Sequence, residues 1–321
     1  MTSTLDAIGS DARGRTTPVR PPRGQQKARS RAHARRSLAR AVPLVPAIGL
    51  LVVFLVGPIL SSFYGSFTNM SLTGSAAASA QWVGLQNYID LFNSPDFPVS
   101  VWLTLVFLIG SAVIGQNVVG MLLALLMRNG SRWVGALVST FVVGAWVLPE
   151  IVAAFASYAF FSQHGTLNAI LAGFGITGPS WLFAFPMLSI ILANTWRGTA
   201  FSMLVYSAAL QEVPPEITEA AEVDGANGAK RFFLVTLPMI RRSISTNLML
   251  ITLQTLSVFT LIYVMTGGGP GNKSMTLPVL AYQEAFKFSE LGYGTAIATI
   301  LLLVGAVFAI VYVRALKTEV D

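Results

Sequence analysis

Six long apolar runs, each almost free of charge, constrain the fold of this chain more than any other feature of its sequence. Each run has about the 20 mostly apolar residues that a helix needs to cross a bilayer. Lipid cannot satisfy backbone polar groups, so each run is predicted to be a helix, and none shows the alternation of a transmembrane β-strand. The predicted spans cover about residues 43–64, 101–127, 134–161, 183–210, 244–265 and 294–313.

The scarcity of charge excludes a water-soluble fold of this size. Charged residues make up 11% of the chain and hydrophobic residues 54%, whereas about 25% of the residues in a soluble domain are charged. Cysteine is absent, which excludes disulfides and thiolate metal sites, and the two histidines, His33 and His164, offer little for a catalytic or metal centre. The predicted fold class is an all-α integral membrane protein with six transmembrane helices, without catalytic or metal-binding residues.

The segment 1–42 differs from the rest of the chain because it holds ten of the 21 Lys and Arg residues. It has few large apolar residues, so we expect a disordered tail that contacts anionic lipid, and not a nucleic-acid-binding arm. The apolar run that follows Arg35-Arg36 is longer than the apolar part of a signal peptide. We therefore expect an uncleaved first helix.

The distribution of basic residues predicts the orientation. With six spans, eighteen of the 21 Lys and Arg residues fall on the side that holds both termini, and Lys273 and Lys287 fall on the other side. Arg197 is the remaining one and lies within a span. Because basic residues accumulate on the cytoplasmic side, both termini, including the short segment 316–321, are predicted to be cytoplasmic.

The loop 211–243 between the fourth and fifth spans is predicted to be a compact pair of helices on the cytoplasmic surface. Pro214 and Pro215 suit the start of the first helix. Its acidic residues, Glu216, Glu219 and Glu222, then lie toward the positive end of the helix dipole. Gly225 suits a left-handed helix end, and Pro238 is expected to bend the second helix toward the fifth span.

This loop resembles the EAA motif of the permease subunits of ABC importers. The similarity rests on Glu219-Ala220-Ala221, three intervening residues, Gly225, nine intervening residues, Val235, one intervening residue and then Leu237-Pro238. In that family the loop is a coupling helix that docks into a cleft on the ATP-binding subunit. The resemblance therefore implies a type I ABC importer transmembrane fold over residues 43–315. Its implied coupling residues are Glu219, Ala220, Ala221, Asp224, Gly225, Leu237 and Pro238.

Further segments resemble carbohydrate permeases of the maltose, glycerol-phosphate and oligosaccharide type, in particular the first permease of the pair. They are the run from Trp82 to Tyr88, Gly165–Asn168, Met265–Pro270 with Tyr282 and Phe286, and Gly292–Gly294. The resemblance implies transport of a sugar or oligosaccharide by alternating access in a bacterial inner membrane. It implies as partners a second homologous permease, two ATP-binding subunits that carry ATP and Mg, and an extracytoplasmic solute-binding protein.

The run Gly267–Ser274 resembles a phosphate-binding P-loop only superficially. The P-loop pattern requires glycine immediately before the lysine, and here Asn272 occupies that position. No strand is predicted before it, and the topology places it outside the cell. We therefore expect no nucleotide cofactor on this chain.

Polar residues within the fourth and fifth spans are candidates for the substrate path. Arg197 near the centre of its span is costly in lipid. It is expected either to donate to substrate or to form an internal ion pair, for which Glu150 is the candidate partner, or to extend to the interface. In the family the middles of these spans line the path, which implies as candidates Arg197, Gly198, Phe201, Gln254, Thr255 and Val258.

Other functional classes remain open at this stage. An importer permease for a solute other than a sugar would carry the same loop. A self-sufficient secondary transporter would leave the EAA-like loop unexplained and would be expected to show an inverted repeat, which we do not find. An intramembrane enzyme would need a nucleophile and base or a metal centre, for which two separate histidines are insufficient.

Overall fold

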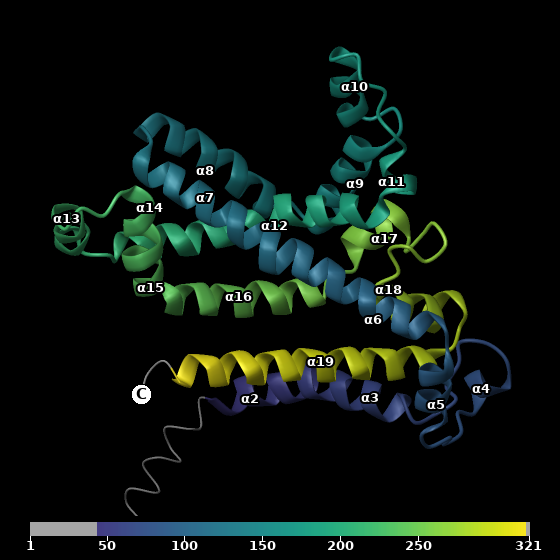
Figure 1. Ribbon diagram of the computed structural model, residues 1–321. Helices are drawn as coiled ribbons and strands as arrows, with labels where there is room; N and C mark the ends of the chain where they lie inside the picture. Colours follow the sequence, from purple (N-terminus) through teal and green to yellow (C-terminus); the bar gives the residue numbers. More distant parts are fainter. Residues whose placement is uncertain (1–43, 319–321) are drawn as a thin grey trace, which may run out of the picture. The chain divides into compact units, whose positions relative to one another are not determined.

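The computed structural model describes residues 44–318, which form helices and one isolated β-bridge between Thr68 and Trp82 (Figure 1). The predicted tail 1–42 and residues 319–321 of the C-terminal segment lie outside the described residues. The chain divides into two compact units, Met1–Ser61 and Ser62–Asp321. Each unit is described by itself.

The described part of the first unit is apolar helix. It runs through α2 (Val45–Leu51) and a π-helical turn η2 (Val52–Val56) into α3 (Gly57–Gly65), the last four residues of which belong to the second unit. Together these segments form one helix of 21 residues, Val45–Gly65, which is long and apolar enough to cross a membrane. Its bounds agree with the first predicted span.

The second unit is a bundle of helices connected by short loops. Its elements are α4 (Ser75–Ala78), α5 (Gln86–Asn93), α6 (Asp96–Phe107), η3 (Leu108–Gln116), α7 (Asn117–Asn129), α8 (Arg132–Val147), α9 (Glu150–Phe161), α10 (Thr166–Gly173), α11 (Trp181–Ala184), α12 (Pro186–Gln211), α13 (Pro215–Val223), α14 (Gly228–Arg231), η4 (Phe232–Thr236), α15 (Leu237–Met239), α16 (Arg241–Leu256), α17 (Thr260–Thr266), α18 (Leu277–Tyr282), η5 (Gln283–Lys287) and α19 (Leu291–Thr318).

Two further spans are continuous and two are broken. Asp96–Arg128 and Leu291–Arg314 are each long and apolar enough to cross a membrane. The third predicted span is not one helix, because α8 and α9 meet at an angle of 110°. Pro149 lacks the N–H that would continue α8 and holds Leu148 in an extended conformation. The fifth span bends by 50° between α16 and α17.

The helix α12 is long but less apolar than the spans, because it lies at the centre of the bundle. Its 26 residues pack against α6–α7, α8, α9, α16 and α17. Its buried residues include Ser189, Asn194, Thr199 and Ser202. Neighbouring helices, and not lipid, surround these groups, so polarity is tolerated there. With α12, the helices are compatible with six spans.

Small residues bring the second span close to α12. A Cβ atom added to Gly120 would lie 2.5 Å from the Cβ of Ser202, and one added to Gly110 would lie 2.9 Å from Cδ1 of Ile191. Close approach through glycine is a common way for membrane helices to associate, because it increases van der Waals contact.

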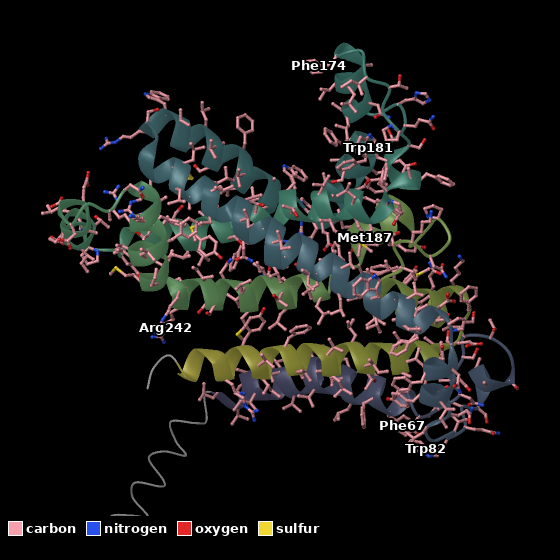
Figure 2. All side chains as sticks on the ribbon, in the orientation of Figure 1. Phe67, Trp82, Phe174, Trp181, Met187 and Arg242 are labelled. Carbon is pink, nitrogen blue, oxygen red and sulfur yellow. The ribbon has the colours of Figure 1, made fainter. Side chains whose placement is uncertain are left out.

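The segment before α6 folds onto the beginning of α19. The rings of Phe67 and Trp82 stack with centroids 5.3 Å apart (Figure 2). Asn87 Nδ2 donates to the carbonyl oxygens of Ser66 and Thr68, and the amide of Gly292 donates to Met70. The helices α5, α17 and α18 lie near one end of the second unit, whereas α13, α14 and α15 lie at its other end (Figure 1).

Candidate functional site

The loop after α12 contains the short helix α13, which ends as the sequence predicts. Pro214 is its N-cap and Glu216 lies in its first turn. Gly225 follows with φ of 82°, and the amide of Ala226 returns to the carbonyl of Ala221 at 2.9 Å. Nothing lies within 4 Å of the position where a Cβ of Gly225 would stand. Glycine is therefore required here by the backbone conformation and not by lack of space.

The candidate coupling residues of α13 face outward. Glu219, Ala220, Asp224 and Gly225 are exposed, and Ala221 is half-buried. Two apolar side chains on the same helix are also exposed, Ile217 by 42% and Val223 by 88%. A short helix that presents small and apolar side chains to solvent is suited to docking against another protein.

The second helical segment of the loop is tied to α13. The side chain of Asn227 caps α14 by accepting from the amide of Lys230. Arg231 Nη1 lies 2.7 Å from Glu222 Oε2, which joins α14 to α13. The chain bends at Ile240, the N-cap of α16, and not at Pro238 as predicted. Pro238 follows Leu237 within the one-turn helix α15. Proline is tolerated in the first turn of a helix, where its missing N–H is not needed.

Both ends of the loop are anchored in one buried cluster. Val213, just before α13, and Ile240, just after α15, are 5% and 4% exposed. They pack together with Ala124 of α7 and with Tyr206 and Leu210 of α12. A displacement of the loop must therefore move these spans or open their packing.

A buried polar network continues from this cluster into the bundle. Asn247 Nδ2 of α16 lies 3.0 Å from Asn117 Oδ1, Ser202 Oγ and Tyr206 Oη. Tyr206 also donates to Asn117. Nearer the centre of the bundle, Asn194 donates to Ser111 Oγ at 2.9 Å. The network connects α7, α12 and α16 between the loop and the candidate path.

The predicted ion pair between Glu150 and Arg197 is not formed. The structure shows a salt bridge between Glu222 and Arg231 but none between Glu150 and Arg197. Glu150 Oε1 and Arg197 Nε are both buried without a hydrogen-bond partner. The prediction placed Glu150 inside a straight helix, but the break at Pro149 puts it at the start of α9, where the helix dipole favours a carboxylate.

The structure gives Gly198 and Phe201 distinct surroundings. A Cβ atom at Gly198 would overlap the side-chain amide of Gln116, so this glycine permits η3 and α12 to approach. Phe201 is half-buried, and its ring centroid lies 6.1 Å from that of Trp146 at the end of α8. Phe201 therefore lies beside the end of α8, and Arg197 is one turn before it on α12.

The candidates on the fifth span flank its break. Gln254 is exposed in the last turn of α16, and Val258 lies between α16 and α17, half-buried against the main core cluster. Thr255 is 3% exposed and packs inside the bundle, so it does not line an open surface. Broken helices are a common means of building binding sites inside membranes, because the free backbone groups face a cavity.

Sequence reasoning missed the residues that connect the helices. Gln116, Asn117 and Tyr206 were not among the candidates. A signal was available, because Asn194, Gly198, Ser202 and Tyr206 recur every four residues and therefore lie on one face of α12. A polar face on a helix predicted to cross a membrane indicates contact with other helices and not with lipid.

Comparison with known proteins identifies the family. Residues 116–320 match the family described as binding-protein-dependent transport system inner membrane component. The sulfoquinovosyl glycerol transport system permease protein SmoG of Agrobacterium fabrum is 34% identical over 285 residues, which cover 86% of this chain and 89% of that protein. The trehalose/maltose transport system permease protein MalF of Thermococcus litoralis is 29% identical over 274 residues, 84% of this chain and 91% of that protein.

The fold is also that of a solved importer. The structure of a bacterial ABC transporter involved in the import of the acidic polysaccharide alginate superposes with a TM-score of 0.76. The sequences are 22% identical, and the match covers 91% of this chain and 100% of the solved chain. The all-α type I importer fold predicted from the sequence is therefore confirmed. The chain belongs to the family of binding-protein-dependent transport system inner membrane components and is a multi-pass membrane permease subunit of such a system, not an enzyme.

Proposed function

We propose that this chain forms half of the translocation path of a bacterial ABC importer for a sugar or oligosaccharide. The family depends on a binding protein. Two relatives that match most of the chain are named as permeases for sulfoquinovosyl glycerol and for trehalose and maltose. A path that combines aromatic rings with polar side chains also suits a hydroxyl-rich ligand, because rings stack on sugar faces and polar groups bond to hydroxyls.

The assembly that this function requires has four further subunits. A second homologous permease completes the path as a heterodimer, and two ATP-binding subunits hold ATP and Mg. An extracytoplasmic solute-binding protein delivers the sugar. In this arrangement the chain is an inner-membrane protein with both termini and the loop 211–243 in the cytoplasm, as the distribution of basic residues favours.

The observation that carries the proposal is the exposed helix α13 in a loop whose two ends, Val213 and Ile240, share one buried cluster. We assign Glu219, Ala220, Ala221, Asp224 and Gly225 to the surface that enters the ATPase cleft, with Leu237 and Pro238 shaping the return of the chain. Closure of the ATPase subunits would move α13. Val213 and Ile240 would transmit that movement to α7 and α12.

The candidate substrate path lies where the spans are interrupted. Phe201 on α12 lies beside the end of α8, with Arg197 one turn before it, and Gln254 and Val258 flank the α16–α17 break. We propose that these side chains contact substrate in the inward- or outward-open state. Gly198 and Thr255 are proposed to hold these side chains in position. Gly198 leaves space for the side chain of Gln116, and Thr255 is buried within the bundle.

The test of this function is a charge reversal on α13 in the reconstituted transporter. Glu219→Lys is expected to abolish the stimulation of ATP hydrolysis by sugar-loaded binding protein, because it reverses a charge at the docking surface. Glu212→Lys is the matched control, since Glu212 is also exposed but lies before the motif. Sugar binding to the isolated binding protein is expected to be unchanged by either variant.

Two outcomes would contradict the proposal. Normal assembly and full stimulation in Glu219→Lys would show that α13 is not the coupling element. A binding protein that is stabilised by amino acids or metal ions but by no sugar in a thermal-shift panel would replace the sugar with another solute class.

A further inference from the structure

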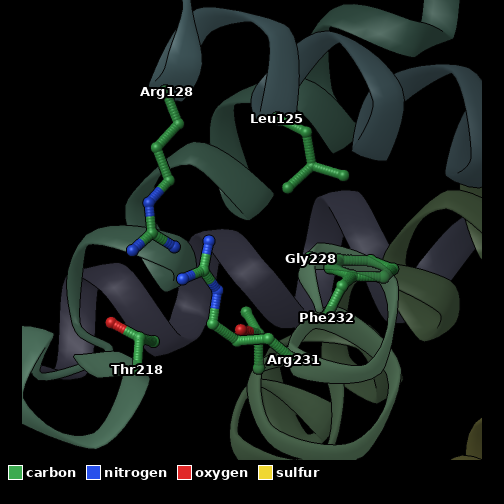
Figure 3. Close-up of a pocket in the computed structure, with 7 residues that line it drawn as sticks. Leu125, Arg128, Thr218, Gly228, Arg231 and Phe232 are labelled. Atoms are coloured by element: carbon green, nitrogen blue, oxygen red, sulfur yellow. The ribbon is translucent and has the colours of Figure 1, made fainter. Parts of the chain in front are cut away.

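A basic cleft lies beside the coupling loop. It has a volume of about 380 Å³ and is lined by Leu125, Arg128, Thr218, Gly228, Arg231, Phe232 and Thr236. These residues come from the end of α7, from α13 and from the segment α14–η4. Figure 3 shows the guanidinium groups of Arg128 and Arg231 pointing toward one another across this cleft.

Acidic side chains of this chain neutralise only part of the positive charge of the two arginines. Arg231 donates one hydrogen bond to Glu222, which does not line the cleft. No hydrogen bond or ion pair of Arg128 is found among the described residues, and no acidic side chain lines the cleft. A guanidinium has five N–H donors in a planar fork. Most of the donors in the cleft are therefore free to bind an anion, which would also relieve the repulsion between the two like charges.

The position of the cleft defines the class of anion. Arg128 is the last residue of the apolar helix Asp96–Arg128, so the cleft lies beside the end of a candidate membrane span. Leu125 and Phe232 give it an apolar wall, whereas the arginines and the Thr218 hydroxyl give it a polar one. Paired arginines match the tetrahedral oxygens of phosphate, and basic pockets beside the ends of membrane spans bind anionic headgroups.

We propose that this cleft is a phosphate-binding site that links the second span to the coupling loop. The phosphate group belongs either to an anionic phospholipid or to free phosphate. Arg128 belongs to α7, whereas Arg231 and Thr218 belong to the loop, so a bound phosphate from either source ties the loop to α7. The regulatory consequence rests on the proposed coupling function of α13, but the binding site does not.

The experiment compares Arg128→Gln with Arg132→Gln in the assembled transporter. Arg132 is the matched control because it lies in the same connection between spans and is exposed, but does not line the cleft. The transporter is extracted from nanodiscs of equal parts phosphatidylcholine and phosphatidylglycerol, and retained lipid is measured by native mass spectrometry. We expect Arg128→Gln to retain phosphatidylglycerol about tenfold less strongly, since it loses a charge-assisted contact, and Arg132→Gln to behave as the wild type.

Inorganic phosphate distinguishes the two sources. Thermal stability is measured in phosphatidylcholine nanodiscs with and without millimolar phosphate. Stabilisation of the wild type and not of Arg128→Gln assigns the site to free phosphate, whereas selective retention of phosphatidylglycerol without a response to phosphate assigns it to lipid. Arg128→Lys is expected to restore only part of the binding, because lysine keeps the charge and loses the fork.

Equal retention and equal phosphate response in Arg128→Gln and wild type would overturn the proposal. Phosphatidylglycerol retained by the isolated full-length chain but not by the assembled transporter would also overturn it, since the partner ATPase would then fill the cleft. Sugar-stimulated ATP hydrolysis is recorded for the wild type in the same nanodiscs. A wild type without sugar-stimulated ATP hydrolysis would contradict the proposed function. It would leave the result on phosphate binding unaffected.

Discussion

At Gly198 the space for a side chain is already taken by Gln116. The amide of Gln116 lies where a Cβ would be placed, and its Nε2 donates to the carbonyl of Asn194 at 3.3 Å. Gln116 is 3% exposed and belongs to the π-helical segment η3. One glycine thus decides how closely η3 and α12 pack beside the candidate path.

Gly198→Ala is expected to destabilise the protein by about 1–3 kcal/mol, because the added methyl group overpacks this contact. The change is measured as a lowered melting temperature in detergent. Adding Gln116→Ala should recover part of the loss. Gly135→Ala is the control, since no atom lies within 4 Å of a Cβ at that helical position; an equal loss in both alanine variants would show that the Gln116 contact is not the cause.

Arg197 and Glu150 are expected to behave independently. Because they form no ion pair, the coupling energy between Arg197→Met and Glu150→Gln in a double-mutant cycle should lie within about 0.5 kcal/mol of zero. Arg197→Met should also leave the melting temperature unchanged or raise it, since it removes a buried nitrogen without a partner, while uptake of sugar into proteoliposomes falls. Destabilisation by Arg197→Met that Glu150→Gln reverses would restore the ion pair as the correct interpretation.

At the scale of elements, the loop 211–243 is a short helix, a left-handed glycine and a second helical segment. The Asn227 cap and the Glu222–Arg231 bridge hold the two helical segments together within the chain itself. A preformed docking element loses little conformational freedom on binding. Its angle depends on the single positive φ at Gly225.

Gly225→Ala is expected to cost about 1–2 kcal/mol, the penalty for an L-residue in the left-handed region. The effect should appear as weaker association of the ATPase subunits during affinity purification. Gly225→Asn should lose less, since asparagine tolerates this conformation. Gly173→Ala, which also points into open space but has no positive φ, serves as the control. Full association in Gly225→Ala would show that the loop adapts to its partner.

The sequence predicted elements best where one physical requirement dominated. The second and sixth spans follow from length and lack of charge, and the left-handed end of α13 follows from Gly225. The breaks at Pro149 and near Val258 were not predicted. The third and fifth predicted spans are as apolar as a continuous helix, and hydropathy carries no information on the bending of a helix. The partners of Gln116, Asn117 and Tyr206 depend on packing between distant segments, which no local pattern specifies.

At the scale of the whole molecule, polarity is sorted along two directions. Basic residues distinguish the two ends of the predicted spans, and polar residues concentrate on α12 at the centre of the second unit. The first sorting predicts the orientation, and the second is the basis for the proposed path of a hydrophilic solute.

Reporter fusions test the orientation directly. A fusion at residue 321 should give a cytoplasmic signal, and a fusion within 266–293 should give an external one, because eighteen basic residues against two favour this arrangement. Alkaline phosphatase and fluorescent-protein reporters give opposite readouts at each site. An external signal at residue 321 would invalidate both the six-span arrangement and the assignment of α13 to the ATPase.

The shared anchoring of Val213 and Ile240 has a consequence for how such permeases diversify. The loop leaves and re-enters the bundle at the same cluster. Exchange of the segment between Val213 and Ile240 is therefore expected to preserve the contacts of this cluster. If the loop couples to the ATPase as proposed, substitutions between these two residues would change which ATPase subunit binds. Substitutions at the interrupted spans would change which solute is carried. A chimera that carries residues 214–239 of a distant relative should accept the relative's ATPase and keep its own cargo.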